Sequence, residues 1–183
     1  NAALDGMSYI TAANFNGVDS LTFTASDGSL TSAPATVSIA VTAVNDAPSF
    51  TKGANPTVTE DAGAQAVSGW ATALATGPAD EAGQSLSFTL TDNNSALFGT
   101  PPAISPEGTL SYTPAAEASG LATVSVRLQD SGGTANGGVD TTATQSFTVS
   151  VTAVNDAPTL AEIAAQSMPE DSVLTGIALT VDE

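Results

Sequence analysis

The sequence predicts an all-β protein made of β-sandwich modules that follow one another end to end. Two observations predict this architecture: an octapeptide that occurs twice, and short segments in which apolar and polar residues alternate. The octapeptide VTAVNDAP stands at Val41–Pro48 and returns 110 residues later at Val151–Pro158. A repeat of this length indicates a tandem array of similar units. Alternation with a period of two indicates strands that have one face in a core and the other in solvent.

The repeat divides the chain into three parts. Upstream of the octapeptide, corresponding residues of the two repeats are 103 positions apart, so that Asp27 corresponds to Asp130. The smaller offset predicts an insertion of seven residues in the complete module, and we place it in the Gly-rich loop Ser131–Thr142, where extra length is tolerated. The expected modules are the C-terminal part of a first (1–45), a complete second (46–155) and the N-terminal part of a third (156–183).

The strands are expected where the alternation is clearest. These segments are Ser20–Ser26 and Pro34–Val44 in the first module, and Leu86–Leu90, Val124–Leu128 and Phe147–Val151 in the complete one. Six or seven short strands in about 110 residues, separated by Gly, Pro and Asn, are typical of a sandwich of immunoglobulin-like size. Trp70 is the expected anchor of its core. No segment shows a sustained helical period.

The composition excludes several classes of function. The chain has 19 acidic and 2 basic residues, a net charge of −17, and no His or Cys. Nucleic-acid binding and attachment through a basic membrane-surface helix both require clustered Lys and Arg. No apolar run approaches the roughly 20 residues that a membrane span needs. Without His or Cys there is no Ser–His–Asp triad, no Cys–His nucleophile and no thiolate or imidazole zinc site.

Carboxylates remain, and they concentrate where strands end and modules meet. In end-to-end modules we expect them to gather at two junctions. The first junction is expected to hold Asp27, Asn45, Asp46, Glu60, Asp61, Asp80 and Glu81. The second is expected to hold Asp130, Asn155, Asp156, Glu170, Asp171, Asp182 and Glu183. Such carboxylates repel one another, and calcium, which takes six to eight oxygen ligands, would relieve the repulsion better than magnesium. The alternative is that Asp and Asn are simply common in turns.

The connectors also carry a resemblance to a known family. The sequence Val-Asn-Asp-Ala-Pro, with a strand-ending Asp upstream and Glu-Asp and Asp-Glu elements downstream, resembles the cadherin-like and VCBS-type repeats of very large bacterial surface proteins. These include the extender regions of RTX adhesins that are exported by type I secretion. The resemblance covers essentially the whole chain, and the recurrence of Asn-Asp-Ala-Pro at the module boundary makes it fairly specific.

The resemblance implies a set of calcium ligands. In cadherin-type repeats the linker Asn and Asp, an acid near the domain start, an Asp-x-Asp element and a strand-end Asp coordinate calcium between successive domains. The matching residues are Asn45-Asp46 and Asn155-Asp156, Glu60 and Glu170, Asp80-Glu81 and Asp182-Glu183, and Asp27 and Asp130. Two departures occur: Ala43 and Val44 precede the linker Asn in place of its first acid, and Asp80 and Glu81 are adjacent. Two or three ions per junction are therefore expected.

The expected function is structural and non-catalytic. We expect a calcium-binding repeat that stiffens an adhesin or fibre at the cell surface or outside the cell, with calcium and the neighbouring modules of the same polypeptide as its partners. One alternative is an adhesion module that binds a carbohydrate or a cell receptor, with Ser131–Thr142 and Asn93–Phe98 as candidate surfaces. Another is a filament subunit whose incomplete end modules are completed by strands of like chains. Catalysis is not expected, because the acids cluster at connectors and not in a visible pocket.

Overall fold

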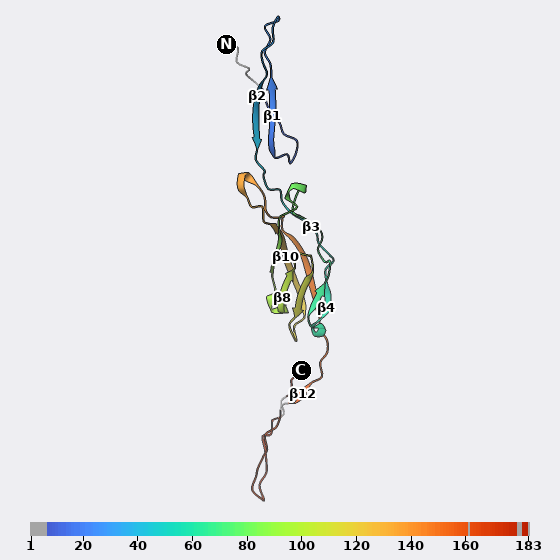
Figure 1. Ribbon diagram of the computed structural model, residues 1–183. Helices are drawn as coiled ribbons and strands as arrows, with labels where there is room; N and C mark the ends of the chain where they lie inside the picture. Colours follow the sequence, from blue (N-terminus) through green and yellow to red (C-terminus); the bar gives the residue numbers. More distant parts are fainter. Residues whose placement is uncertain (1–6, 161, 179–180, 183) are drawn as a thin grey trace.

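The computed structural model describes residues 7–160, 162–178 and 181–182 as an elongated chain of three β-rich parts (Figure 1). A two-stranded hairpin lies at one end, a sandwich lies in the middle, and a thin C-terminal segment extends from its far side. The described residues include no helix that is long and apolar enough to cross a membrane. The described secondary structure consists of strands and a few short 3-10 turns, so the fold is all-β, as the alternating pattern predicts.

The N-terminal hairpin consists of β1 (Gly17–Phe23) and β2 (Ala35–Val41), which pair antiparallel from Gly17 opposite Val41 to Phe23 opposite Ala35. The strands keep the expected alternation, but the hairpin has no second layer in the described part of the chain, so that Val18 and Val37 are exposed. The two strands are joined by a long loop, residues 24–34, whose tip lies far from the sandwich (Figure 1). Asp27 lies in the turn of this loop, which the bridge between Ser26 and Thr31 closes.

The central sandwich has two layers. One layer is a four-stranded sheet in the order β4-β11-β10-β7, formed by Thr57–Thr59, Gln145–Thr152, Gly120–Asp130 and Leu86–Asp92. The other contains the three-stranded sheet β5-β9-β8, formed by Gln65–Val67, Leu110–Pro114 and Phe98–Ile104, and the pair of β3 (Ser49–Thr51) with β6 (Thr72–Ala75). All pairings are antiparallel except that of β4 with β11.

The core lies between these layers, where the inward residues of the alternating strands meet. Val124, Val126 and Leu128 on β10 are fully buried. Trp70 is 4% exposed, and its ring lies 4.4 Å from that of Phe147 on β11, while its indole N–H donates to the Ala54 carbonyl. Trp70 is thus the core anchor that the sequence predicts, with its one polar atom satisfied.

Short connecting elements place the acidic residues at the two ends of the sandwich. Four 3-10 turns interrupt the loops: η1 (Glu60–Ala62), η2 (Ala79–Glu81), η3 (Ser95–Leu97) and η4 (Ala135–Gly137). Beyond the second octapeptide the described residues form only the short pair of β12 (Thr159–Leu160) with β13 (Val181–Asp182). The five predicted strand segments are confirmed as β1, β2, β7, β10 and β11, whereas the module limits at 45/46 and 155/156 stay predictions.

Replacing Trp70 by Ala should lower the free energy of unfolding by about 3–5 kcal/mol, because a large aromatic side chain is lost from a close-packed core. Urea denaturation followed by circular dichroism measures this change. Leu121→Ala, at a position on β10 that is 64% exposed, is the control and should change stability by no more than about 0.5 kcal/mol. Similar losses for the two variants would show that Trp70 does not anchor the core.

Candidate metal centre

Strand direction decides which acids meet. Strand β11 runs toward the second connector, and β10 is antiparallel to it, so β10 ends at Asp130 at the opposite end of the sandwich, beside the first connector. Strand β4 is parallel to β11, so Glu60, which follows β4, lies at the second connector. The expected grouping is therefore wrong in two respects: Asp130 belongs to the first junction, and Glu60 with Asp61 belongs to the second.

At the first junction the connector is bonded directly to the end of β10. The Asn45 side-chain amide Nδ2 donates to Asp130 Oδ1 at 3.0 Å and to the Val139 carbonyl at 2.7 Å, and its Oδ1 accepts from Gln84 Nε2 at 2.7 Å. Asp130 Oδ1 also accepts the Gly132 backbone N–H at 2.9 Å. One oxygen of Asp130 is therefore fully engaged in holding the connector and the loop.

The acids of η2 meet the same connector from the other side. The Asp46 backbone N–H donates to Glu81 Oε1 at 2.9 Å. Asp80 Oδ2 accepts from Asn16 Nδ2 at 2.6 Å, which is a direct contact between the N-terminal hairpin and the sandwich. The first junction thus brings together five predicted residues: Asn45, Asp46, Asp80, Glu81 and, against expectation, Asp130.

Besides the amide oxygen Oε1 of Gln84, two carboxylate oxygen atoms at this junction are buried without a hydrogen-bond partner. They are Glu81 Oε2 and Asp130 Oδ2, on side chains that are 8% and 5% exposed. The backbone is also close, because a Cβ atom at Gly77 would overlap Glu81 Oε2 and one at Gly132 would overlap Asn45 Oδ1. A buried carboxylate oxygen that finds no donor is costly, at roughly 1–3 kcal/mol or more for a charged group. An adjacent cation would remove that cost.

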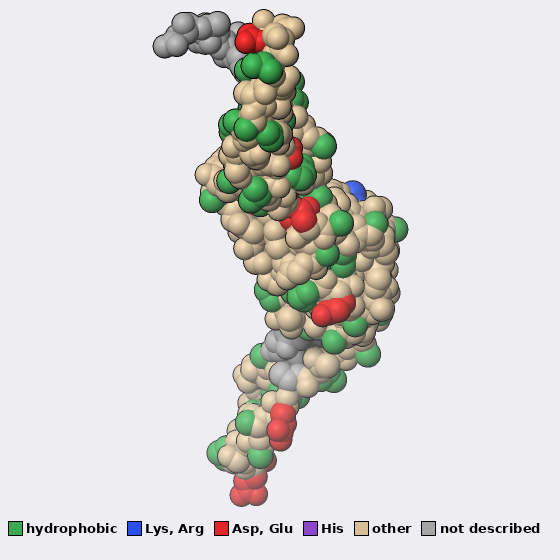
Figure 2. Space-filling view, turned by 45° about the horizontal axis from the view of Figure 1, so that its top comes forward, with side chains coloured by type: hydrophobic (Ala, Val, Ile, Leu, Met, Phe, Trp, Pro, Cys, Tyr) green, Lys and Arg blue, Asp and Glu red, His purple; other side chains and the backbone are tan. Residues whose placement is uncertain are grey.

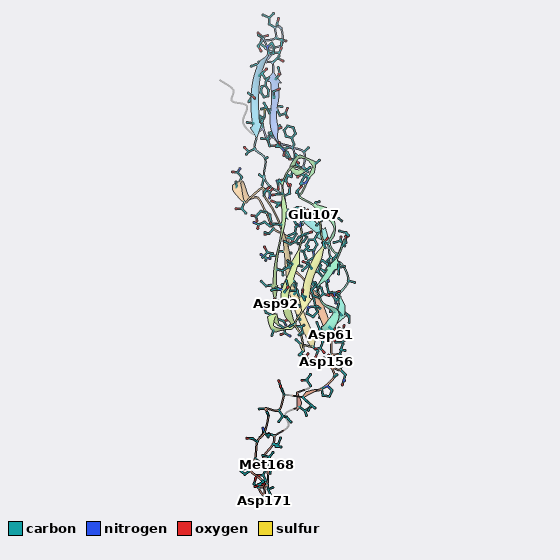
Figure 3. The ribbon with its side chains drawn as sticks, turned by 60° about the horizontal axis from the view of Figure 1, so that its bottom comes forward. Asp61, Asp92, Glu107, Asp156, Met168 and Asp171 are labelled. Carbon is teal, nitrogen blue, oxygen red and sulfur yellow. The ribbon has the colours of Figure 1, made fainter. Side chains whose placement is uncertain are left out.

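The second junction gathers a different set of acids. Glu60 is 7% exposed, and its Oε1 accepts the Val154 backbone N–H at 2.7 Å. Asp61 and Asp156 lie close together at this end of the sandwich (Figure 3). Glu117 lies beside them, and repulsion chiefly from Asp156, with desolvation and the charges of Glu60 and Asp61, raises the pKa of its carboxyl. A hollow of about 280 Å³ is lined here by Glu117, Val154, Asn155, Asp156 and Pro158.

Glu117 was missed by the sequence prediction. It lies in the loop between β9 and β10 and has a positive φ of 59°, a conformation that is uncommon for residues other than Gly, Asn and Asp. At the offset of 103 its counterpart is Asn14, whose φ is also 59°. The repeat offset could have identified Glu117. Its counterpart Asn14 is typical of a turn, and the same turn in the next repeat places Glu117 near the connector.

Several predicted ligands lie away from both junctions. Asp27 lies at the far tip of the hairpin, where its Oδ1 accepts the backbone N–H groups of Ser29 and Leu30, and these bonds lower the pKa of its carboxyl. Its place in the first junction is therefore wrong. Asp171 lies at the far tip of the C-terminal segment, away from Asp156, and its neighbour Glu170 is there with it (Figure 3). The side chain of Asp182 and the whole of Glu183 lie outside the described residues.

The candidate metal ligands at both junctions are oxygen atoms, but they do not form a complete coordination shell. Within the described residues, no three His, Cys, Asp or Glu side chains already converge to hold a metal ion. Hard cations such as calcium also take backbone, amide and water oxygens, so two buried carboxylates can begin a site without completing it. Acidic side chains form separate patches along the molecule, as Figure 2 shows, and no single acidic face is present in that view.

Replacing Glu117 by Gln should stabilise the metal-free protein at pH 7, because the raised pKa means that the ionised form is disfavoured in the fold. The gain should disappear as pH falls below the ordinary pKa of Glu, where the carboxyl is protonated in both states. Thermal unfolding in EDTA between pH 3.5 and 7.5 measures it. Glu107→Gln is the matched control: a hydrogen bond from Ser105 lowers the pKa of Glu107, so its removal should not stabilise. A destabilised Glu117→Gln at pH 7 would contradict the repulsion.

The comparisons with known proteins agree with this architecture. A crystal structure of human protocadherin-24 EC1-2 is similar to the chain, with a TM-score of 0.56, 16% sequence identity, and coverage of 80% of this chain and 71% of the other. No curated protein sequence matches it. The family model described as a bacterial Ig domain matches residues 2–40 and 45–152. Domains of this family occur in extracellular or surface proteins as structural or adhesion modules and are generally non-catalytic. The chain belongs to the bacterial Ig domain family, and its fold is similar to that of the cadherin structure.

Proposed function

We propose that this chain is a non-catalytic spacer of a larger bacterial cell-surface or secreted protein, and that calcium bound at its junctions stiffens it. The observation that carries the proposal is the pair of buried carboxylate oxygens without a partner, Glu81 Oε2 and Asp130 Oδ2, at the first junction. A protein buries such atoms at a cost unless a cation or donor compensates them. The protein offers little positive charge to compensate them, because the chain has only two basic residues, Lys52 and Arg127. Arg127 donates a hydrogen bond to Thr144.

The residues at each junction suit calcium by their chemistry. At the first, Asp130 and Glu81 would supply the buried oxygens, with Asp46 and Asp80 on the same connector and turn. At the second, Glu60, Asp61, Asp156 and Glu117 would hold the ion. Calcium tolerates irregular sets of six to eight oxygens, which fits a site made of separate loops. The ion supplies charge neutralisation and a shared coordination shell that links the loops of the junction.

The proposed stiffening follows from the contacts of the two buried Glu residues, each of which is bonded to one connector. Glu81 binds the connector through the Asp46 N–H, and Glu60 binds the other connector through the Val154 N–H. Asp46 lies where the first connector enters the sandwich, and Val154 lies where the chain leaves the sandwich into the second connector. Each connector can therefore be held where it meets the sandwich. Neutralising the surrounding acids removes the repulsion that would push the neighbouring parts of the chain apart.

Calcium should bind with measurable stoichiometry and raise the melting temperature, with reversal by EDTA, because a ligand at about 100 times its Kd adds about 2.7 kcal/mol per site. Calorimetric titration of the parent is the measurement, and two or three ions per junction are expected. The double variant Glu81→Gln/Asp130→Asn should lose the first-junction ions. Asp27→Asn, the repeat counterpart of Asp130 at the hairpin tip, should leave the titration unchanged. Equal stoichiometry in all three proteins would remove the first junction from the proposal.

The stiffening is tested separately by small-angle scattering and hydrodynamic radius with calcium and with EDTA. The parent should be more extended and less variable in calcium, since the ions hold successive parts of the chain at a set angle. Asp46→Ala and Asp156→Ala should remove this response. If both variants keep the parent's response to the chelator, calcium at the connectors does not set the shape of the chain.

A further inference from the structure

The Gly-rich loop between β10 and β11 contacts the first connector directly. Val139 donates its backbone N–H to the Asn45 carbonyl at 2.9 Å, and the Asn45 side chain donates back to the Val139 carbonyl at 2.7 Å. The two residues are 94 positions apart in the chain. The loop that carries the seven-residue insertion therefore folds over the connector, as its position beside the first junction in Figure 1 also shows.

Asn45 uses its side chain almost completely in this arrangement. Both hydrogens of its amide are donated, to Asp130 and Val139, and its oxygen accepts from Gln84. An amide with both donors and an acceptor satisfied within the protein has little left to offer a cation. Asn45 therefore differs from the ligand role expected of it, because its contacts are with the sandwich and the loop.

The glycines of the loop make the close approach possible. A Cβ atom at Gly132 would overlap the Asn45 amide oxygen, and one at Gly138 would lie 3.1 Å from the Asn45 backbone nitrogen and from its Cβ atom. Between them, Asn136 and Gly137 have φ values of 57° and 87°, which turn the loop back toward the connector. Contact with Asn45 thus explains Gly132 and Gly138, whereas Gly133 and Gly137 have positive φ values and free space around an added Cβ atom.

We propose that Asn45 and the loop Ser131–Thr142 form a latch that fixes the first connector on the sandwich without any metal ion. In this latch Asn45 is a positioning residue: it occupies Asp130 Oδ1 and so leaves Oδ2, the unpartnered oxygen, as the atom available to a cation. Calcium then binds to a junction whose connector is already in place. The latch stands apart from the proposed calcium function, because all of its bonds are between protein atoms.

All three residues that hold the Asn45 side chain lie in the part of the chain that follows it: Gln84, Asp130 and Val139. The latch is therefore made by the sandwich that the connector enters. In the second connector the Asn155 side chain donates to the carbonyl of its own neighbour Asp156 at 3.1 Å and is exposed, which makes it a suitable site for a control substitution.

The test measures the distance between the hairpin and the sandwich in EDTA. Because the chain has no Cys, spin labels on Ser38→Cys in β2 and Ser87→Cys in β7, both exposed, are specific. Double electron–electron resonance should give a narrow distance distribution for the otherwise unchanged protein. Asn45→Asp, which keeps size but loses both donors, and Gly132→Ala should each broaden it at least about twofold. Asn155→Ala, and Gly83→Ala at a site with free space, are the matched controls and should leave it narrow.

Two further measurements separate a latch from a general loss of structure. Asn45→Ala should lower calcium affinity at the first junction by roughly tenfold, as loss of a group that orients a ligand does, and leave the second junction unchanged. Melting temperature shows whether each variant is folded; if Gly132→Ala is not, Asn45→Asp and Asn45→Ala carry the test. A broad distribution for the parent in EDTA that narrows with calcium would overturn the latch and leave the calcium function standing. A narrow distribution for every Asn45 variant would also overturn the latch.

Discussion

The bond between the Asn45 amide and the Asp130 carboxylate is the interaction on which the first junction depends. It joins the connector to the end of the longest strand of the sandwich, β10, which spans Gly120–Asp130 and pairs with both β7 and β11. This strand is thus bonded to a connector residue 85 positions away in sequence. The unpartnered oxygen of Asp130, the buried Glu81 beside the connector and the β10–β11 loop all lie around this contact.

Charge and burial act against each other at both junctions. Glu60, Glu81 and Asp130 are acids that the fold removes from water, and each spends one oxygen on a backbone or amide N–H. The remaining charge is uncompensated by the protein, because the chain has so few Lys and Arg residues. The raised pKa of Glu117 expresses the same conflict on a solvent-exposed side chain. The hard divalent cation that we propose would resolve it with oxygen ligands alone, in a chain without His or Cys.

The first connector shows how a short sequence acquires its contacts from the part of the chain that follows it. Asn45 of its Val-Asn-Asp-Ala-Pro sequence has three side-chain bonds to distant residues. One of them goes to the β10–β11 loop, where Gly132 and Gly138 permit a close approach to Asn45. A loop that would ordinarily be read as tolerated length thus becomes a contact surface.

The sequence by itself determined the all-β class, the repeat, the alternating strands, the burial of Trp70 and the kinds of residue that gather at connectors. These follow from local periodicity and from residue chemistry, which the order of residues contains directly. Only the tertiary structure decided which acids share a junction. Because neighbouring antiparallel strands end at opposite ends of a sandwich, Asp130 lies beside Asn45, and Glu60 lies beside Val154. Asp27, Glu117 and the folded loop likewise depend on strand direction and on contacts across the chain, which spacing alone does not contain.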